Sequence, residues 1–326
     1  LFVTGAAHHI QIRGNRVHDI ATGYKGRVGG DAHGIAVYGT SGSSAIHDIV
    51  IDGNELYSLK LGSSEALVLN GNVESFEVTN NVVHDANNIG IDAIGYEGTA
   101  PANDQARNGV IRGNVVYNIS SFGNPAYGNQ YAATGIYVDG GRDIVIERNI
   151  VHHANIGIEL ASEHSGRATS NVTVRSNFVY QNDVMGIALG GYDMRRGSTE
   201  NCAVVNNTLF HNDTLAQGNG ELLLQYDTRN YVIENNIFYA TSQNLLIANP
   251  FSQNTGNAVD HNLYFAPAGE TGSTWQWKRV TYQNFAAYQA ATGNDAHSLF
   301  ADPQLSSLSA PDLHLLGTSP AIDAGE

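Results

Sequence analysis

The stretch Ile144-Val-Ile-Glu-Arg-Asn149-Ile-Val-His152 recurs in altered form along most of the chain. Aligning the copies on their Asn gives the column Asn15, Asn54, Asn81, Asn114, Asn149, Asn177, Asn207, Asn236 and Asn262. An apolar residue stands two positions after each Asn, and a ring stands three positions after it: His18, Tyr57, His84, Tyr117, His152, Tyr180, Phe210, Tyr239 and Phe265. Neighbouring copies lie between 26 and 39 residues apart. A repeat of constant centre and variable length is typical of a solenoid whose coils carry loops of different size.

The residues before each Asn alternate between apolar and polar, as in Phe76-Glu-Val78 and Val172-Thr-Val174. This is the period of a strand with one buried face, and it predicts a parallel β-helix rather than a helical or leucine-rich solenoid. Stacked coils place like residues about 4.8 Å apart. The inward Asn side chains are therefore expected to form a hydrogen-bonded ladder, and the rings beside them a stack. We assign His18, His84 and His152 to that stack rather than to catalysis.

Composition excludes several classes of partner. The chain of 326 residues has a net charge of −15 and only three lysines, so it offers no basic stripe for nucleic acid. A polyanionic substrate is disfavoured unless a cation bridges it. No apolar run is long enough for a membrane span. The single cysteine, Cys202, falls at an inward strand position, which predicts a buried, inert thiol. The oligomeric state cannot be derived from these features.

Through these ladders, residues 1–265 resemble the right-handed parallel β-helix proteins of the pectate-lyase-like superfamily. The resemblance implies an all-β fold, a single-stranded right-handed parallel β-helix, and a secreted or periplasmic protein. It leaves the function open, because that superfamily contains polysaccharide lyases, glycoside hydrolases, epimerases and non-catalytic binding or adhesion proteins. Since Leu1 already lies within the repeat, we expect the chain to be a processed or trimmed form.

Each unit carries a further strand after the ring column, marked by Gly-Ile or a relative of it. The copies are residues 34–38, 66–69, 90–94, 135–139, 157–161 and 186–190. If the Ile and the residue two positions later point inward, then Asp92, Tyr137, Asp139 and Glu159 point outward on three successive coils. Carboxylates stacked in this way repel one another, so we expect the arrangement to serve a function that compensates for the repulsion.

Long loops flank the same strands, at residues 23–31, 95–108, 120–134, 161–166 and 190–197. Loops on both sides of one sheet are expected to frame a cleft across coils three to six. The predicted substrate-binding residues are Tyr137 on the strand and, in the loops, Lys25, Tyr96, Glu97, Glu163, His164, Tyr192, Asp193, Arg195 and Arg196. For each loop residue alone, a plain solvated loop is the alternative interpretation.

Clustered carboxylates with aromatic neighbours favour glycoside hydrolysis of a polysaccharide or oligosaccharide, with Asp139, Glu159 and Asp92 as the catalytic candidates. That mechanism needs no cofactor. The alternative is a Ca²⁺-dependent polysaccharide lyase in which the same acids hold the ion, with Lys25, Arg142, Arg195 or Arg196 as base or charge neutraliser. A third class is a non-catalytic glycan-binding β-helix. Metal ligands are not assigned.

The repeat ends near Ala266, and residues 266–326 are predicted to cap the solenoid as part of the same domain. Residues 281–291 have the pattern of an amphipathic helix that ends at Gly293. Trp275 and Trp277 can form a sugar platform or pack the cap, and we favour packing.

Overall fold

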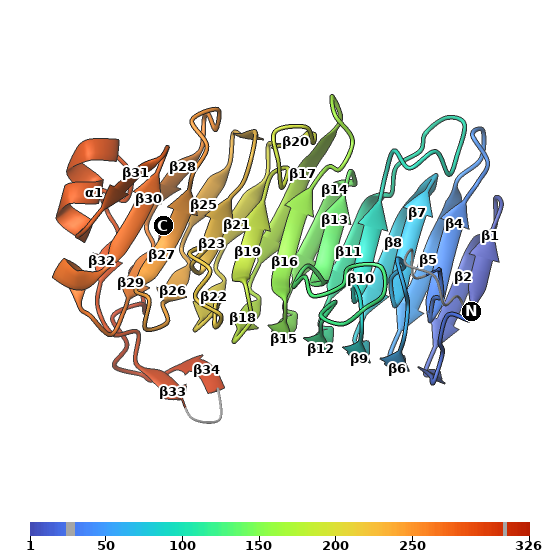
Figure 1. The fold of residues 1–326 in the computed structure, drawn as a ribbon, viewed down its shortest axis with the longest axis horizontal. Coiled ribbons are helices and arrows are strands. Elements are labelled where there is room, and N and C mark those ends of the chain that lie inside the picture. Colours follow the sequence, from blue (N-terminus) through green and yellow to red (C-terminus); the bar gives the residue numbers. More distant parts are fainter. Residues whose placement is uncertain (24–29, 309–311) are drawn as a thin grey trace.

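Each predicted repeat forms one coil of short strands, and the strands of successive coils pair in parallel along three sheets (Figure 1). The computed structural model describes residues 1–23, 30–308 and 312–326. Sheet A contains β1 (Phe2–Thr4), β4 (Ile35–Gly39), β7 (Leu67–Gly71), β10 (Ile91–Ile94), β13 (Thr134–Asp139), β16 (Ile156–Ala161), β19 (Met185–Leu189), β23 (Leu222–Leu224), β27 (Leu245–Asn249), β30 (Thr274–Trp277) and β31 (Val280–Tyr282).

Sheets B and C complete each coil. Sheet B contains β2 (His8–Arg13), β5 (Ile46–Asp52), β8 (Val73–Thr79), β11 (Arg107–Arg112), β14 (Arg142–Glu147), β17 (Ala168–Arg175), β20 (Ser198–Glu200), β21 (Ala203–Val205), β24 (Thr228–Arg229), β25 (Val232–Glu234) and β28 (Ala258–Asp260). Sheet C contains β3 (Arg16–His18), β6 (Glu55–Leu59), β9 (Val82–Ala86), β12 (Val115–Ile119), β15 (Ile150–Ala154), β18 (Phe178–Tyr180), β22 (Thr208–Phe210), β26 (Ile237–Tyr239), β29 (Leu263–Phe265) and β32 (Leu299–Phe300). The predicted all-β, right-handed parallel β-helix is therefore confirmed.

The Asn column forms the expected ladder inside the turn between sheets B and C. The Asn54 amide donates to Oδ1 of Asn81 at 2.9 Å and to the backbone oxygen of Ile12 at 2.9 Å. Asn81 repeats the pattern with Asn114, and the chain of bonds runs from Asn15 to Asn262. Each Asn side chain thus bonds to the next Asn in the ladder, and these bonds fix the register between successive coils.

The ring column stacks on the outer face of sheet C. From His18 to Tyr180, neighbouring rings lie nearly parallel with centroids 4.7–5.3 Å apart. Beyond Tyr180 the geometry changes, and Phe210 meets Tyr239 edge to face at 77°. The assignment of His84 and His152 to this stack is confirmed. Cys202 is buried as expected, and burial raises the pKa of its thiol to about 11.

The parallel ladder continues past Phe265, because β30 pairs with β27 and β32 pairs with β29. The helix of the cap, α1 (Phe285–Thr292), begins at the Asn284 N-cap and ends at Gly293, whose φ is 73°. It starts later than predicted, because Thr281 lies in β31, which runs antiparallel to β30. The remaining elements are η1 (Glu270–Gly272), β33 (Leu305–Ser307) and β34 (Asp312–Leu315).

Trp275 is fully buried, and its ring stacks against Phe285 and Tyr288 of α1. The interpretation of this residue as packing of the cap is confirmed. The helices in the described part of the chain are too short or too polar to cross a lipid bilayer.

Candidate active site

The outward positions of sheet A bring the predicted acids together. The strand register places Asp92 of β10 beside Tyr137 of β13, and Tyr137 beside Glu159 of β16. Ile91 and Ala93, on either side of Asp92, belong to the core, so Asp92 points to the other face of the sheet. Asp139 lies two residues beyond Tyr137 and therefore shares that face.

These four side chains are almost fully covered, although they lie on the outward face of the sheet. Asp92, Tyr137, Asp139 and Glu159 are 2%, 4%, 5% and 5% exposed. Thr134 donates its hydroxyl to Oε2 of Glu159 at 2.9 Å, and the backbone N–H of Glu163 donates to Oδ1 of Asp139 at 2.7 Å. Neighbouring chain segments therefore shield the row from water while leaving a cavity beside it.

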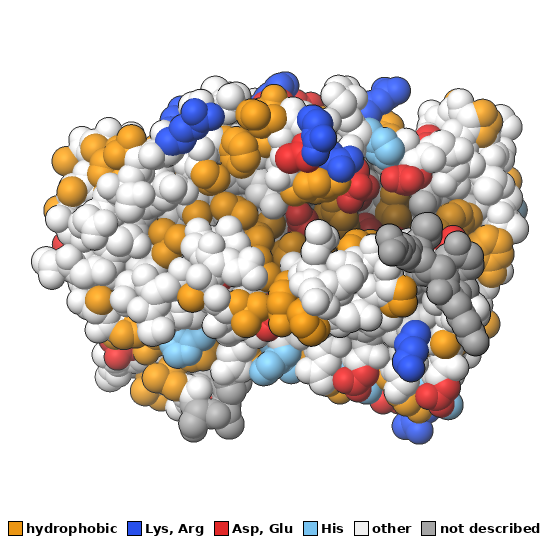
Figure 2. Space-filling view, viewed as in Figure 1, with side chains coloured by type: hydrophobic (Ala, Val, Ile, Leu, Met, Phe, Trp, Pro, Cys, Tyr) orange, Lys and Arg blue, Asp and Glu red, His pale blue; other side chains and the backbone are white. Residues whose placement is uncertain are grey.

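That cavity has a volume of about 460 Å³ and lies over coils one to five of sheet A. Figure 2 shows acidic side chains within a hollow on this face of the molecule. The lining residues are Phe2, Asp31, His33, Tyr38, Ser63, Ser64, Glu65, Asn70, Ile89, Asp92, Ile94, Glu97, Tyr127, Tyr137, Asp139 and Glu163. We call it the acidic cavity, because six of these residues carry carboxyl groups and none of those described is Lys or Arg.

Burial and mutual repulsion keep these carboxyl groups protonated at higher pH than usual. Burial raises the pKa of Asp92 well above its ordinary range, and the nearby carboxylates of Glu65 and Asp139 raise it further. Burial raises the pKa of Asp139 as well, with Glu163 adding to the shift and the backbone N–H of Glu163 opposing it. The pKa of Glu65 rises to about 8, mainly through burial. Such shifted groups are characteristic of acid–base sites.

Asp92 also has an unsatisfied oxygen. Its Oδ1 is buried and has no hydrogen-bond partner in the structure. An unpaired buried carboxyl oxygen is costly, and it lines a cavity of ligand size. The oxygen is therefore available to a hydroxyl group or a cation that enters the cavity.

Glu159 lies in the same row but does not line the acidic cavity. Burial raises its pKa to about 7, and the hydrogen bond from Thr134 partly opposes the rise. Ile156, Met185 and Ala188 form a buried apolar cluster on the neighbouring outward positions, with Tyr131 of the long loop packed against it. The catalytic role predicted for Glu159 stays a prediction.

Two of the predicted loops meet above the row. Nε2 of His164 lies 2.9 Å from Oε1 of Glu97, and this contact joins the loop after β16 to the loop after β10. The guanidinium of Arg167 lies 5.0 Å from the ring centroid of Tyr96 and makes a second contact between the same loops. The two loops thus converge as expected, but of their described residues only Glu97 and Glu163 line the acidic cavity, whereas Tyr96 and His164 line a separate polar cavity.

The predicted residues in the loop after β19 do not line the acidic cavity. Arg196 donates to the backbone oxygen of Glu163 at 3.3 Å and lies 4.3 Å from the ring centroid of Tyr192. Asp193 and Arg195 pair with each other at 2.9 Å on the surface, away from the acidic cavity. Lys25 lies outside the described residues.

Sequence reasoning missed several residues of the cavity wall: Asp31, His33, Tyr38, Glu65, Asn70 and Tyr127. A signal existed for two of them. His33 and Glu65 each stand directly before a copy of the Gly-Ile motif, in the column that holds Thr134 farther along. His33 Nδ1 lies 3.2 Å from the backbone oxygen of Glu65 and 3.6 Å from its Oε2, so this column adds a contacting pair to the site.

The acid-rich wall is also suited to a hard cation, because Ca²⁺ takes carboxylate and carbonyl oxygens as ligands. Asp92, Glu97, Asp139 and Glu163 offer such oxygens. The same donors serve proton transfer when no ion is bound, so donor type alone does not choose between the two uses.

Comparison with known proteins adds the following matches. The model of the family described as "Right handed beta helix region" matches residues 1–209 and 130–284. The uncharacterized protein YwoF of Bacillus subtilis (strain 168) is 48% identical over 321 residues, which cover 98% of this chain and 67% of the relative.

Two solved structures that superpose on this chain contain a bound DFA-III or pentasaccharide. A DFA-IIIase from Arthrobacter chlorophenolicus A6, solved with DFA-III, superposes with a TM-score of 0.51 at 14% identity, covering 91% of this chain and 63% of that enzyme. A tailspike protein of E. coli bacteriophage HK620, solved with a pentasaccharide, gives a TM-score of 0.47 at 10% identity, covering 92% of this chain and 61% of the tailspike. This chain therefore spans less than two thirds of either structure.

Proposed function

The chain belongs to the right-handed β-helix family, and from that premise we propose that it is a carbohydrate-active enzyme that hydrolyses glycosidic bonds in the acidic cavity. The observation that carries the proposal is the pair Asp92 and Asp139, which face one cavity from adjacent strands with raised pKa values. Hydrolysis of a glycosidic bond needs one carboxylic acid and one carboxylate on either side of that bond.

The geometry of the pair suits this chemistry. One strand spacing and two residues along the strand separate the two Cα atoms, a diagonal of about 8 Å. Carboxyl groups on such a diagonal can reach either the 5–5.5 Å of retaining enzymes or the roughly 6.5–9.5 Å of inverting ones. We therefore leave the stereochemical outcome to experiment.

The surroundings of the two acids differ, and the difference suggests their roles. Asp92 accepts no hydrogen bond at Oδ1, and its pKa is raised by burial and by three neighbouring carboxylates, so it is suited to hold the proton that the leaving oxygen takes. Asp139 is held by the N–H of Glu163, which favours its charged form. We assign Asp92 as the general acid and Asp139 as the base or nucleophile.

Aromatic and amide side chains of the wall supply contacts for a sugar. Tyr38, Tyr127 and Tyr137 line the acidic cavity, as does Asn70. Tyrosine rings pack against the apolar faces of sugars, and their hydroxyls bond to sugar hydroxyls. The volume of about 460 Å³ is in the range of a small-ligand site, so we expect it to hold a short part of a longer chain.

The second candidate is a Ca²⁺-dependent polysaccharide lyase, favoured by the number of carboxylates in one cavity. Elimination next to a uronate needs a base and a cation to neutralise the sugar acid. Among the described residues that line the cavity there is no Lys or Arg, so bound Ca²⁺ would have to supply all of the positive charge. Arg142 lies in a separate polar cavity beside Tyr96 and His164.

A panel of neutral, amino-sugar and uronate polysaccharides tests the proposal. We expect new reducing ends without unsaturated sugars, and equal rates with and without EDTA. Unsaturated products and loss of activity on chelation would replace hydrolysis with the lyase mechanism. Binding of a glycan without any product would leave a glycan-binding β-helix and contradict the enzyme. As the resemblance implies a secreted or periplasmic protein, extracellular and envelope glycans belong first in the panel.

A further inference from the structure

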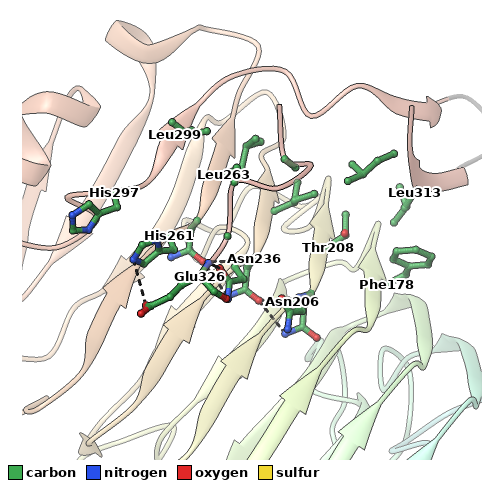
Figure 3. A pocket seen from close by; sticks show the side chains of 18 of the residues that line it. Phe178, Asn206, Thr208, Asn236, His261, Leu263, His297, Leu299, Leu313 and Glu326 are labelled. Atoms are coloured by element: carbon green, nitrogen blue, oxygen red, sulfur yellow. Dashed lines mark hydrogen bonds and ion pairs between the residues drawn. The ribbon is translucent and has the colours of Figure 1, made fainter. Parts of the chain in front are cut away.

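A group of two histidines and two carboxylates lies at the other end of the molecule, where the cap meets the last coils. Asp260 ends β28, and His261 follows it in the turn to β29. His297 belongs to the cap just before β32, and Glu326 is held beside the same turn by a bond from its backbone N–H to Oδ1 of Asn235 at 3.0 Å. Figure 3 shows His261, His297 and Glu326 at one end of a cavity of about 440 Å³.

The ligand atoms of these residues face one another. His297 Nδ1 lies 2.7 Å from Oδ2 of Asp260, and His261 Nε2 lies 3.9 Å from the same oxygen. His261 Nε2 also lies 3.5 Å from Oε2 of Glu326. The atoms of Asp260, His261 and His297 all lie within 4.8 Å of one another. Ligands in a tetrahedral zinc site with bonds of about 2.0–2.1 Å stand about 3.3 Å apart, so the observed separations bracket the required value.

Two backbone hydrogen bonds fix the orientation of the Asp260 carboxylate. Its Oδ1 accepts the backbone N–H of His261 at 2.9 Å and that of His297 at 2.8 Å. Oδ2 is then left to face the two imidazoles, whose rings lie 5.0 Å apart and nearly parallel at 13°. Fixing of a ligating carboxylate by outer hydrogen bonds is characteristic of metal sites in proteins.

The turn itself does not require a histidine. His261 has a φ of 54°, in the left-handed region, and Asn206 and Asn235 take the same turn position in the two preceding coils with φ of 57° and 58°. Asn adopts this conformation readily. The backbone conformation therefore does not explain the imidazole at this position, whereas a role as metal ligand does.

We propose that Asp260, His261, His297 and Glu326 form a zinc site that ties the cap to the last coil of the β-helix. Imidazole nitrogens and carboxylate oxygens are both zinc ligands, and four of them fill its tetrahedral coordination, whereas Ca²⁺ prefers six to eight oxygens. Because the four ligands come from three separate segments, the ion links the exposed end of the stack to the chain that covers it.

Titration of the full chain with ZnCl₂ tests the site. We expect one zinc per chain by calorimetry, a rise in the thermal midpoint that EDTA reverses, and, with Co²⁺ in place of zinc, the strong visible absorption of a tetrahedral site. His261→Asn keeps the turn, because Asn occupies it in three other coils. This variant and His297→Ala should each weaken zinc binding by more than about 100-fold, because loss of even an outer partner costs about 10–100-fold.

His314→Ala is the matched control. His314 pairs with Asp312 and lines the same cavity beside Phe178, so its loss removes an equivalent exposed His–Asp pair without removing any of the four proposed ligands. The control should bind zinc like the wild-type chain. The proposal is overturned if the wild-type chain binds no zinc, if His261→Asn and His297→Ala bind it unchanged, or if His314→Ala loses as much as they do.

Discussion

Sheets A and B of the β-helix differ in how the charged side chains on their outward faces are paired. On sheet B, the register places Arg112, Glu147 and Arg175 side by side on three successive strands, and both arginines bond to the glutamate. On sheet A, the equivalent outward row holds Asp92, Tyr137 and Glu159, with no cation between the acids. The row on sheet B alternates in sign, as a row that serves stability should.

The pKa values follow the same division. Although burial alone would raise it, hydrogen bonds from Arg175 and Arg112 hold the pKa of Glu147 below its ordinary value. Burial raises the pKa of Glu159 to about 7. The fold thus pairs the buried Glu147 with two arginines, whereas among the described residues no Lys or Arg lines the acidic cavity of sheet A. We infer that sheet A keeps its buried acids for chemistry at a cost in stability.

The largest expected effect of this division is on turnover. Asp92→Asn and Asp139→Asn preserve shape and remove proton transfer, so each should lower turnover of a confirmed substrate by about 10²-fold or more. Glu147→Gln on sheet B is the control and should turn over at the wild-type rate. Steady-state kinetics on the three variants checks this, and wild-type rates for both Asp variants would exclude the acids from catalysis.

A second effect concerns the pH dependence of stability. The folded-state pKa of Glu159 lies near 7 and that of Glu65 near 8, both above the ordinary value of 4.5. The stability that these two protonated groups contribute to the free energy of unfolding is therefore fully present below about pH 4.5. It is lost as the pH rises through 7–8. For Glu159 alone the loss is up to about 3 kcal/mol.

Urea unfolding of the wild-type chain at pH 5 and pH 8 measures this loss. Glu159→Gln should reduce the difference between the two pH values, because the amide cannot ionise. A wild-type chain whose free energy of unfolding rises across this range, with Glu159→Gln behaving identically, would show that the row on sheet A is not strained.

The smallest expected effect is the loss of stability when the paired glutamate of sheet B is neutralised. Glu147→Gln should destabilise the fold by about 0.5–1 kcal/mol at pH 7, because the side chain links two partly exposed arginines. Glu159→Gln at the same pH should be neutral or stabilising. Chemical unfolding of the two variants under one condition compares them, and equal losses would remove the distinction between the sheets.

The fold could be read from the sequence because its determinants recur. An Asn with a ring three positions later, as in Asn149 and His152, fixes one turn of every coil, and alternation then sets which residues point inward. The same alternation predicts that Asp92, Tyr137 and Glu159 lie in one row.

The position of the site along the stack could not be read in this way. The sequence gives the length of the loop at residues 120–134 but not its direction. In the structure Thr134 bonds to Glu159, Tyr131 packs against the apolar cluster that contains Ile156 and Ala188, and the open cavity lies toward the first coils. Glu65 lies just before β7, outside the strand, so its column in the repeat is visible in the sequence but strand alternation does not predict its approach to Asp92.

Direct titration of the carboxyl groups tests the central claim, and it needs no substrate. Carbon-13 NMR of the side-chain carboxyls, assigned with Asp92→Asn, Asp139→Asn, Glu159→Gln and Glu147→Gln, gives each pKa in the folded protein. We predict that Asp92, Asp139 and Glu159 titrate well above the ordinary range near 4, and that Glu147 titrates below it. Ordinary values for all three acids of sheet A would contradict a protonated acid held ready in the acidic cavity.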